Sequence, residues 1–369
     1  MQYRKFGKTG ETVSVLGFGA MRFPYRDGKV DADEAVAMLR RAMDAGLTYI
    51  DTAYFYHDGE SEGIVGRALK DGYREKVHVA TKLPVCLVEK PEDFERFLST
   101  QLERLDIDAI DFYLLHALDR KEWDKAKRFG LLEKMEQAKR EGKIRHIGFS
   151  FHDDYEIFQQ ILDEYDGWEF CQIQLNYIGL DYQAGIRGLE YAASKGLGIV
   201  IMEPLLGGKL AIPPRGVQAV LDDRKTPVEW ALDFLWNRPE VTLLLSGMST
   251  MQQAEDNLLY ADRARVGMLN DAELAMLAEA KTVYDTTALV PCTKCRYCMP
   301  CPFGVEIPRV FEGYNMTVSQ GMDAANAFYA DIEGKADKCR ACRKCEKMCP
   351  QHIEISAVMA EARAAFAKD

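Results

Sequence analysis

Long apolar runs are missing from this sequence. No stretch of its 369 residues is apolar enough and long enough to span a bilayer, and the N-terminal MQYRKFGKTGETV has no apolar signal region. An excess of positive charge is missing too: the net charge is −11, which disfavours a nucleic-acid or anionic-membrane partner. We therefore expect a cytoplasmic protein with neither kind of partner.

Cysteine is scarce in most of the chain. Only Cys86 and Cys171 occur before residue 292, while the other eight of the ten cysteines lie between Cys292 and Cys349. A secreted disulfide framework would need a signal peptide, and it rarely spaces its cysteines so regularly. Thiols kept reduced to bind metal are therefore the better interpretation.

A GxGxxG motif is absent after the first β-rich run, which reads LGFGAM, and this absence disfavours an open doubly wound sheet. Eight short β-rich runs alternate with helix-period segments, which predicts a closed (β/α)8 barrel of the TIM type. The preceding YRKFGKTGETVSV is expected to form a hairpin that closes the barrel floor. The eight runs begin at Val15, Thr48, Val77, Ile110, Ile144, Phe170, Gly198 and Thr242.

The chain is longer than one core usually supports, which predicts one large domain and one small one. A helix with NDAE as its start signal is expected from Asn270 to about Asp285. The short linker TTALVP follows, with a boundary near Thr286, and the cysteine-rich region beyond it has helical patterns between its cysteine runs. The predicted fold is thus an α/β barrel over residues 1–285 and a small, mainly helical iron–sulfur domain over residues 286–369.

Four side chains with catalytic potential follow three neighbouring strands. Asp51 and Tyr56 follow the second predicted strand, Lys82 ends the third and His116 ends the fourth. In a (β/α)8 barrel the reacting residues lie at the C-terminal ends of the strands, so these four should share one mouth. Each alone has an ordinary interpretation as a cap, a packed ring or a solvated side chain, and their combination favours catalysis. Substrate loops are expected after strands one, four and seven, RFPYRDGKV and ALDRKEWDKAKRFG among them.

The four side chains together suit the reduction of a carbonyl. Such a reaction needs a hydride at carbon and a proton at oxygen, and a free tyrosine, with a pKa of about 10, is a weak acid near neutrality. An ammonium such as Lys82 beside Tyr56 favours the phenolate, and Asp51 would hold that ammonium in place. A neutral His116 would hydrogen-bond the substrate oxygen. The hydride must come from a cofactor, because no side chain supplies one.

Six segments have a distinctive sequence: YRKFGKTGETVSVLGFGAMRF, YIDTAYFYHDGESEGIVGRAL, VATKLP, DFYLLHALD, IRHIGFS and FCQIQLNY. Together they resemble the aldo-keto reductase family over nearly all of residues 1–285. The resemblance implies an NAD(P)H-dependent oxidoreductase that interconverts a small-molecule aldehyde or ketone and an alcohol, with the four residues as a tetrad and Tyr56 as its acid and base. It also implies nicotinamide contacts from Ser150 and Gln172, with Asp51 near the ribose. The other implied cofactor-binding residues are Gly19, Ala20, Met21, Pro204, Leu205, Leu206, Gly207, Ser246, Gly247, Gln253 and Asn257.

Several positions depart from the usual pattern of the family. Phe151 stands where an Asn often follows the strand-five Ser, and Met202 stands where a Tyr often stacks on the nicotinamide. Glu203 then places a carboxylate close to the cofactor. Gly247 and Gln253 replace the two cations that usually clamp the 2′-phosphate of NADPH, so charge-assisted phosphate binding is lost. We therefore expect NADH to be used at least as well as NADPH.

The cysteines form two runs of related spacing. The second, CRACRKCEKMCP, has the C-x2-C-x2-C-x3-C-P pattern of bacterial two-cluster ferredoxins, in which the fourth cysteine binds the other cluster. The first, CTKCRYCMPCP, is one residue shorter before its last cysteine, which makes the crossing of Cys301 the least regular part of the pattern. One cluster and a zinc site are the alternatives, although zinc favours paired CxxC units. The spacing predicts two [4Fe–4S] clusters, the first bound by Cys292, Cys295, Cys298 and Cys349 and the second by Cys339, Cys342, Cys345 and Cys301.

The cysteine region resembles the α-helical dicluster ferredoxins and the C-terminal extension of a prokaryotic branch of aldo-keto reductases. Two functions follow: a carbonyl reductase with structural clusters, or an electron-transfer protein whose clusters serve a partner such as ferredoxin or a flavoprotein. Basic residues around the second run would dock an acidic partner, or they would only offset the charge of a cluster. A hydride carries two electrons and a cluster accepts one, so electron transfer needs a mediator, usually a flavin, for which the sequence shows no signature. The intact tetrad disfavours a third class, a binding subunit with a silent barrel.

Overall fold

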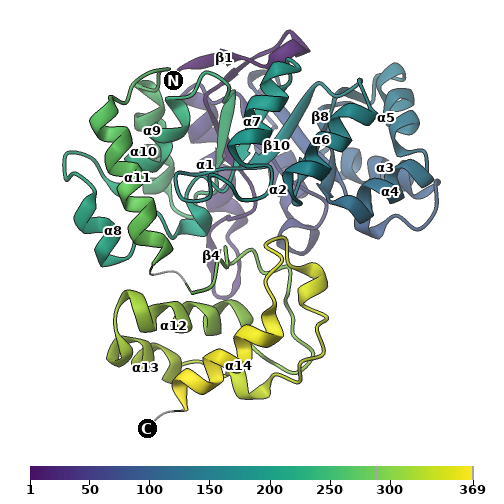
Figure 1. The fold of residues 1–369 in the computed structure, drawn as a ribbon. Coiled ribbons are helices and arrows are strands. Elements are labelled where there is room, and N and C mark those ends of the chain that lie inside the picture. Colours follow the sequence, from purple (N-terminus) through teal and green to yellow (C-terminus); the bar gives the residue numbers. More distant parts are fainter. Residues whose placement is uncertain (287–288, 368–369) are drawn as a thin grey trace. The chain divides into compact units, whose positions relative to one another are not determined.

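The computed structural model describes residues 1–286 and 289–367 (Figure 1), and by its internal contacts the chain divides into two compact units. The first unit comprises residues 1–204 and 232–268, and the second comprises residues 205–231 and 269–369. Helix α9 (Pro227–Trp236) contains one of the crossings between them. The predicted boundary near Thr286 stays a prediction, and residues 287–288 of the predicted linker lie outside the described residues.

The first unit contains the predicted barrel. In the described part of the chain, eight parallel strands close on themselves in the order β10-β11-β12-β3-β6-β7-β8-β9, which keeps the chain order around the barrel. Their side chains are buried almost throughout, as expected for parallel strands that are covered on both faces. The strands are β3 (Leu16–Gly19), β6 (Tyr49–Asp51), β7 (His78–Leu83), β8 (Ile110–Leu118), β9 (Ile144–Phe151), β10 (Phe170–Gln174), β11 (Gly198–Met202) and β12 (Leu243–Ser246).

Amphipathic helices follow the strands and surround the barrel (Figure 1). Side chains cap the starts of α1 and α6: the Asp31 carboxylate accepts a hydrogen bond from the Glu34 amide at 3.2 Å, and that of Asp154 accepts one from the Ile157 amide at 3.0 Å. The helices of this unit are α1 (Ala32–Asp44), α2 (Ser61–Ala68), α3 (Asp93–Leu105), α4 (Arg120–Arg128), α5 (Leu131–Arg140), α6 (Tyr155–Glu164), α7 (Gly185–Ser194) and α10 (Met251–Asp262), together with the end of α9.

Two segments expected as substrate loops have regular structure. The segment ALDRKEWDKAKRFG contains helix α4, which Asp119 caps by accepting a hydrogen bond from the Glu122 amide at 2.6 Å. Its apolar face consists of little more than the buried Trp123 and Ala126, which is too short a stripe to stand out in the sequence. The segment RFPYRDGKV forms a small hairpin of β4 (Tyr25–Arg26) and β5 (Lys29–Val30).

A hairpin closes the barrel floor, as predicted. Strands β1 (Tyr3–Lys5) and β2 (Thr12–Ser14) pair antiparallel, and Phe6 between them stacks on Phe112 with ring centroids 4.7 Å apart. Gly198, at the start of β11, leaves the room that the Phe6 ring occupies, because a Cβ there would overlap the ring. The floor cluster comprises Phe6, Val13, Tyr49, Ala80, Phe112, Leu114, Phe170, Val200, Leu243 and Leu245.

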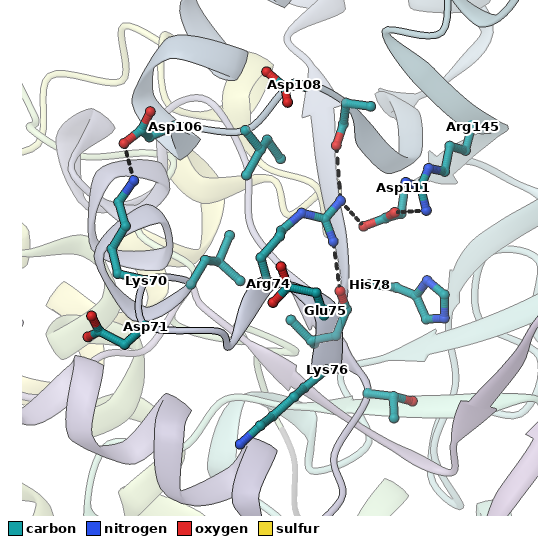
Figure 2. A pocket seen from close by; sticks show the side chains of 15 residues that line it. Lys70, Asp71, Arg74, Glu75, Lys76, His78, Asp106, Asp108, Asp111 and Arg145 are labelled. Carbon is teal, nitrogen blue, oxygen red and sulfur yellow. Dashed lines mark hydrogen bonds and ion pairs between the residues drawn. The ribbon is translucent and has the colours of Figure 1, made fainter.

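A pocket at the N-terminal ends of β6 to β9 is bridged by ion pairs (Figure 2). The buried Asp111 carboxylate forms ion pairs with Arg74 at 2.9 Å and with Arg145 at 3.0 Å, and it also accepts a hydrogen bond from the Val79 amide at 2.8 Å. Arg74 donates as well to the carbonyl of Ala109 at 3.1 Å. The charges here are compensated within the protein, which is typical of the end of the barrel that serves stability.

The second unit is mainly helical, as predicted for the cysteine region. Helix α11 (Asp271–Asp285) begins with a capping box, in which Asn270 and Glu273 exchange two hydrogen bonds of 3.0 Å, and this confirms the NDAE start signal. The other helices are α8 (Arg215–Val220), α12 (Ile307–Ser319), α13 (Met322–Ala330) and α14 (Ile355–Phe366). An apolar core of its own holds the last three, with Val310, Phe311, Ile332, Ile355 and Met359 among its members. Among the described residues, no helix combines the length and apolarity needed to cross a membrane.

Candidate active site and cysteine cavities

Three of the four predicted catalytic side chains meet at the C-terminal mouth of the barrel. The Lys82 ammonium on β7 donates to the Asp51 carboxylate at the end of β6 over 2.6 Å. It donates also to the Thr52 carbonyl at 2.7 Å, and its Nζ lies 3.5 Å from the Tyr56 hydroxyl. The fourth, His116, lies edge-on to Tyr56 with ring centroids 6.0 Å apart. The predicted convergence from three neighbouring strands is therefore present.

Local backbone irregularities direct two of these side chains. Tyr56 begins a short turn in which His57 and Asp58 have φ of 52° and 54°, in the left-handed region. His116 lies within β8 rather than at its end, because the strand continues to Leu118. The register with β9 shifts between Leu115 and Leu118, and such bulges re-aim side chains next to active sites.

The bulge is held by a residue that was expected to contact the cofactor. Ala117 has a φ of 55°, and its amide donates to the Ser150 hydroxyl on β9 at 2.7 Å. Phe55 stacks on the His116 ring with centroids 4.8 Å apart, which fixes the plane of the imidazole. Ser150 and Phe55 thus set the position of His116, and sequence reasoning missed this role for both.

Burial sets the protonation of the site. Desolvation lowers the pKa of His116 well below its usual value, and the Lys82 charge lowers it further, so the imidazole is neutral at physiological pH. Desolvation also lowers the pKa of Lys82 and raises that of Asp51, and the opposite charge of the partner counters both shifts. Asp51 and Lys82 are almost fully buried, so their attraction acts in a low-dielectric environment.

A buried network behind Lys82 was not predicted. The Glu62 carboxylate accepts hydrogen bonds from Thr81 at 2.6 Å, from Gln101 at 2.7 Å and from Arg104 at 3.1 Å. Gln101 also donates to the Lys82 carbonyl at 3.0 Å, so the network fixes the strand that carries the lysine. No spacing in the sequence marks Glu62, because its partners come from distant segments.

The residues implied for cofactor binding fall into two sets. The Ala20 amide donates to the Asp51 carbonyl at 2.8 Å, so the Gly19–Met21 turn lies beside the tetrad. At the end of β12, Ser246 accepts a hydrogen bond from Asn257 at 2.8 Å, and Gln253 accepts one from the Ser249 amide at 2.8 Å. Pro204 ends the first unit, whereas Leu205, Leu206 and Gly207 belong to the second unit and are considered with the cysteines below.

A cation lies next to one of the positions where the phosphate clamp is missing. A Cβ at Gly247 would lie 3.1 Å from the Cβ, Cγ and Cδ atoms of Arg22, so the absence of a side chain at 247 makes room for this arginine. The Arg22 guanidinium lies 4.0 Å from the Glu203 carboxylate, which offsets its charge. Neither Arg22 nor this ion pair could be recognised from the sequence.

Unpartnered polar atoms at the mouth fit a bound dinucleotide. Among the described residues, Asp51 Oδ2, His116 Nδ1 and Gln172 Oε1 are buried and have no hydrogen-bond partner. Buried polar atoms are rarely left unsatisfied in a folded protein, so such a group of orphans marks a place for a ligand. Asp51 and Gln172 are also two of the residues implied for the nicotinamide ribose and the nicotinamide.

The eight cysteines of the two runs line two separate cavities in the second unit. The first cavity is lined by Cys292, Cys295, Cys298 and Cys349, and the second by Cys301, Cys339, Cys342 and Cys345. These are the two sets expected from the ferredoxin cross-over, including the exchanged Cys301 and Cys349. Ile307 and Ile355 line both cavities, so a thin apolar wall separates them.

The two runs have the same backbone conformation around their first three cysteines. Lys294 and Arg296 have φ of 57° and 67°, and Ala341 and Arg343, at the matching positions, have φ of 50° and 57°. In each run the amide two residues after the first cysteine donates to its sulfur, at 3.4 Å in the first run and 3.5 Å in the second. The residue missing before Cys301 therefore leaves the earlier part of its run unchanged.

These cavities suit a cluster better than a single ion. In the described part of the chain, no three His, Cys, Asp or Glu side chains have the spacing to hold one metal ion, whereas the four thiols around a cluster enclose a wider space. Burial raises the pKa of Cys298 to about 12 and that of Cys345 to about 11, so these thiols become thiolates only with a cationic partner.

The segment implied to cover the dinucleotide packs against the first cysteine run within the second unit. Gly207 has a φ of 67°, and a Cβ there would overlap the Thr293 carbonyl. The Lys209 ammonium donates to the Val290 carbonyl at 2.9 Å. The loop after β11 and the first cysteine cavity therefore form one packed structure.

Comparison with known proteins agrees with both parts of this arrangement. The profile described as "Aldo/keto reductase family" matches residues 15–213, and the profile described as "4Fe-4S dicluster domain" matches residues 291–354. The chain is 28% identical over 291 residues to L-galactose dehydrogenase of Arabidopsis thaliana, which covers 70% of this chain and 87% of that protein. It is 32% identical over 233 residues to an uncharacterised oxidoreductase of Bacillus subtilis, over 57% of this chain and 68% of that protein.

Solved structures share the barrel. An aldo-keto reductase from Klebsiella pneumoniae in complex with NADPH superposes with a TM-score of 0.62 at 25% identity, over 76% of this chain and 95% of that one. The holo form of an aldo-keto reductase from Bacillus halodurans gives a TM-score of 0.65 at 24% identity, over 76% of this chain and 96% of that one. The chain belongs to the aldo/keto reductase family of oxidoreductases and carries a 4Fe-4S dicluster domain after its barrel.

Proposed function

We propose that the protein is an NAD(P)H-dependent carbonyl reductase and alcohol dehydrogenase in which Tyr56 transfers the proton. The observation that carries this proposal is the position of the Lys82 ammonium, 2.6 Å from the Asp51 carboxylate and 3.5 Å from the Tyr56 hydroxyl. A cation held there stabilises the phenolate that remains once the tyrosine has given its proton. Asp51 prevents the buried ammonium from losing its charge.

The other mouth residues bind and orient. Neutral His116 donates a hydrogen bond to the substrate oxygen and fixes the carbonyl beside the Tyr56 hydroxyl. Because the imidazole is neutral, it adds no second positive charge next to the Lys82 ammonium. Asp51 Oδ2 and Gln172 Oε1, unpartnered among the described residues, hold the ribose and the nicotinamide carboxamide. A bound NAD(P)H supplies the hydride. The similar enzyme from Klebsiella pneumoniae was solved with NADPH, which supports a dinucleotide at this mouth.

We propose further that NADH serves at least as well as NADPH. Gly247 and Gln253 carry no charge, and the Arg22 guanidinium, whose side chain lies beside Gly247, is 4.0 Å from the Glu203 carboxylate. A 2′-phosphate would gain little charge-assisted binding there and would be repelled by the Glu203 carboxylate. The kcat/KM values for the two cofactors test this, and a hundredfold preference for NADPH would contradict it.

Two [4Fe–4S] clusters complete the proposal, one in each cysteine cavity. Support comes from the two sets of four cysteines, the repeated loop conformation and the amides directed at the sulfurs of Cys292 and Cys339. Anaerobic purification with iron and sulfide counting tests the number of clusters. Half the iron expected for two clusters, or bound zinc, would refute the proposal of two [4Fe–4S] clusters.

The catalytic assignment is tested by replacing Tyr56 with phenylalanine. We expect kcat for carbonyl reduction to fall by about 10²- to 10⁴-fold, with little change in the affinity for NADH, because only the proton donor is removed. Tyr54→Phe is the matched control, since the Tyr54 ring packs on Phe97, with centroids 4.9 Å apart, and on the Arg104 guanidinium. Full activity of Tyr56→Phe would refute the assignment.

An electron-transfer function is the second candidate, favoured by the packing of the Gly207 loop on the first cysteine run. If anaerobic NADH bleaches the visible absorption of the clusters at turnover rates, the barrel and the clusters exchange electrons. The clusters are structural if two results hold: protein without clusters keeps its full rate of carbonyl reduction, and NADH leaves the absorption of the cluster-containing protein unchanged.

A further inference from the structure

The surface around the second cysteine run has a charge opposite to that of the chain as a whole. Five basic side chains lie between residues 338 and 347, where Glu346 is the one acid, although the whole chain carries a net charge of −11. All five side chains are exposed. They are Lys338, Arg340, Arg343, Lys344 and Lys347; we call them the basic patch.

The cations of the basic patch are available to a partner. In the part of the chain that the structure describes, Arg343 alone of the five makes an ion pair, a loose one of 3.9 Å with Glu346. The first cysteine run carries two basic residues, Lys294 and Arg296, and the Lys294 ammonium lies 2.6 Å from the Glu312 carboxylate. The two runs have matching φ values, so the higher positive charge of the second run is not required for a cysteine loop to fold.

The basic patch borders the most accessible point of the two cavities, since Arg340 and Arg343 line the second cavity together with Cys342. Cys342 is exposed, whereas the other seven cysteines of the two runs are partly buried. Phe303, which lines the same cavity as Cys342, is 44% exposed, and Met348 is 53% exposed. Arg340 and Arg343 line this cavity together with Phe303, and exposed apolar side chains next to cations are typical of a protein-binding surface with a polar rim.

The two cavities also form a sequence through the second unit. The first is next to the Gly207 loop, because Gly207 packs on the Thr293 carbonyl. The second adjoins the first across Ile307 and Ile355, and it opens to the surface at Cys342. The order is therefore the Gly207 loop, the first cavity, the second cavity and the basic patch, of which Arg340 and Arg343 line the second cavity.

We propose that the basic patch docks an acidic protein that carries single electrons, of the ferredoxin or flavodoxin kind. This proposal rests on the proposed cluster in the second cavity. One electron would pass between the partner's redox centre and the cluster that Cys301, Cys339, Cys342 and Cys345 would hold: the centre that gives the electron is oxidised by one electron, the other is reduced by one electron, and no proton or bond is exchanged. Opposite charges speed such an encounter and orient the partner, and a transient complex needs little more.

A purely internal role for the same charges makes a different prediction. A cluster bound by four thiolates carries net negative charge, and nearby cations would raise its reduction potential with no partner present. In that case, reversing the charges changes the potential of the cluster but not the binding of an acidic protein.

The test measures binding of the anaerobic holoprotein to oxidised flavodoxin by biolayer interferometry, at ionic strengths from about 20 to 300 mM. The double variant Lys344→Glu with Lys347→Glu reverses two patch charges and leaves every cysteine in place. The control, Arg215→Glu with Arg363→Glu, makes the same change in net charge at two exposed arginines of the second unit that line neither cavity.

We expect the wild type to bind flavodoxin with an affinity that falls as salt rises, the patch variant to bind at least about tenfold more weakly, and the control to bind like the wild type. Cytochrome c, which is basic, should bind the patch variant better than the wild type. Equal binding of flavodoxin by all three proteins would overturn the proposal, and so would binding of duplex DNA that is lost in the patch variant. Iron, sulfide and electron paramagnetic resonance spectra of each protein show separately whether the clusters are present, so a failure of the proposed clusters is distinguishable from a failure of docking.

Discussion

Replacing Lys82 by methionine should destabilise the barrel strongly at neutral pH. The lysine side chain is fully buried, that of Asp51 is 3% exposed, and their charged atoms are 2.6 Å apart. Removing one member of such a pair leaves the other as an uncompensated buried charge, which costs about 3–5 kcal/mol in free energy of unfolding. Methionine keeps most of the lysine's apolar volume, so the cavity contribution is small.

The loss should depend on pH in a defined direction. Burial already raises the pKa of Asp51 above its usual value, and without Lys82 the rise becomes larger. When the pKa of Asp51 is higher in the folded protein than in the unfolded chain, folding favours the protonated acid. The loss in free energy of unfolding is therefore complete above the pKa of the folded protein. It disappears as the pH falls towards the unfolded value of about 3.9. The stability gap between the wild type and Lys82→Met should therefore narrow on acidification.

Urea unfolding followed by tryptophan fluorescence measures these differences, because Trp123, Trp168 and Trp236 are buried in the first unit. A double variant, Asp51→Asn with Lys82→Met, removes both charges and should recover most of the lost stability. The reasoning is refuted if Lys82→Met stays within about 1 kcal/mol of the wild type at pH 7, or if the double variant is as unstable as the single one.

Three further predictions concern other parts of the molecule. Because the pKa of His116 lies well below 6.5, kcat/KM for carbonyl reduction should show no acidic limb from this residue between about pH 6 and 8, and a limb that disappears in His116→Gln would contradict this. Gly207→Ala should lower the thermal stability and the iron content of the second unit more than Gly208→Ala. Both glycines have a positive φ, but only a Cβ at position 207 would meet a backbone carbonyl, so equal losses would refute that contact. Asp111→Asn should cost about 1–3 kcal/mol in free energy of unfolding while kcat of the folded enzyme stays constant, and a change in kcat would give the pocket at the N-terminal ends of β6 to β9 a catalytic role.

The barrel and the tetrad were predictable because both depend on order along the chain. Strand–helix alternation fixes a parallel barrel, and parallel strands bring their C-terminal ends to one mouth, so Asp51, Tyr56, Lys82 and His116 could be grouped without coordinates. The two cysteine sets were predictable for a similar reason, since the spacing of each run determines which cysteine must cross over.

Features that depend on side-chain packing were not predictable. Glu62 supports Lys82 through Thr81, Gln101 and Arg104, and these residues share no sequence spacing with it. Arg22 lies in the space beside Gly247 only because the fold brings the ends of β3 and β12 together. Helix α4 has so short an apolar stripe that its sequence resembles a polar loop.

The way the floor is closed has a consequence for synthesis on the ribosome. Phe6 is among the first residues made, but its ring fits into the space left by Gly198, which is made much later. Until β11 has left the ribosome, the N-terminal hairpin has no complete floor to pack against, and its apolar face stays open to chaperones or to other nascent chains. Slow passage through the middle of the message should therefore promote aggregation more than equally slow passage near its end.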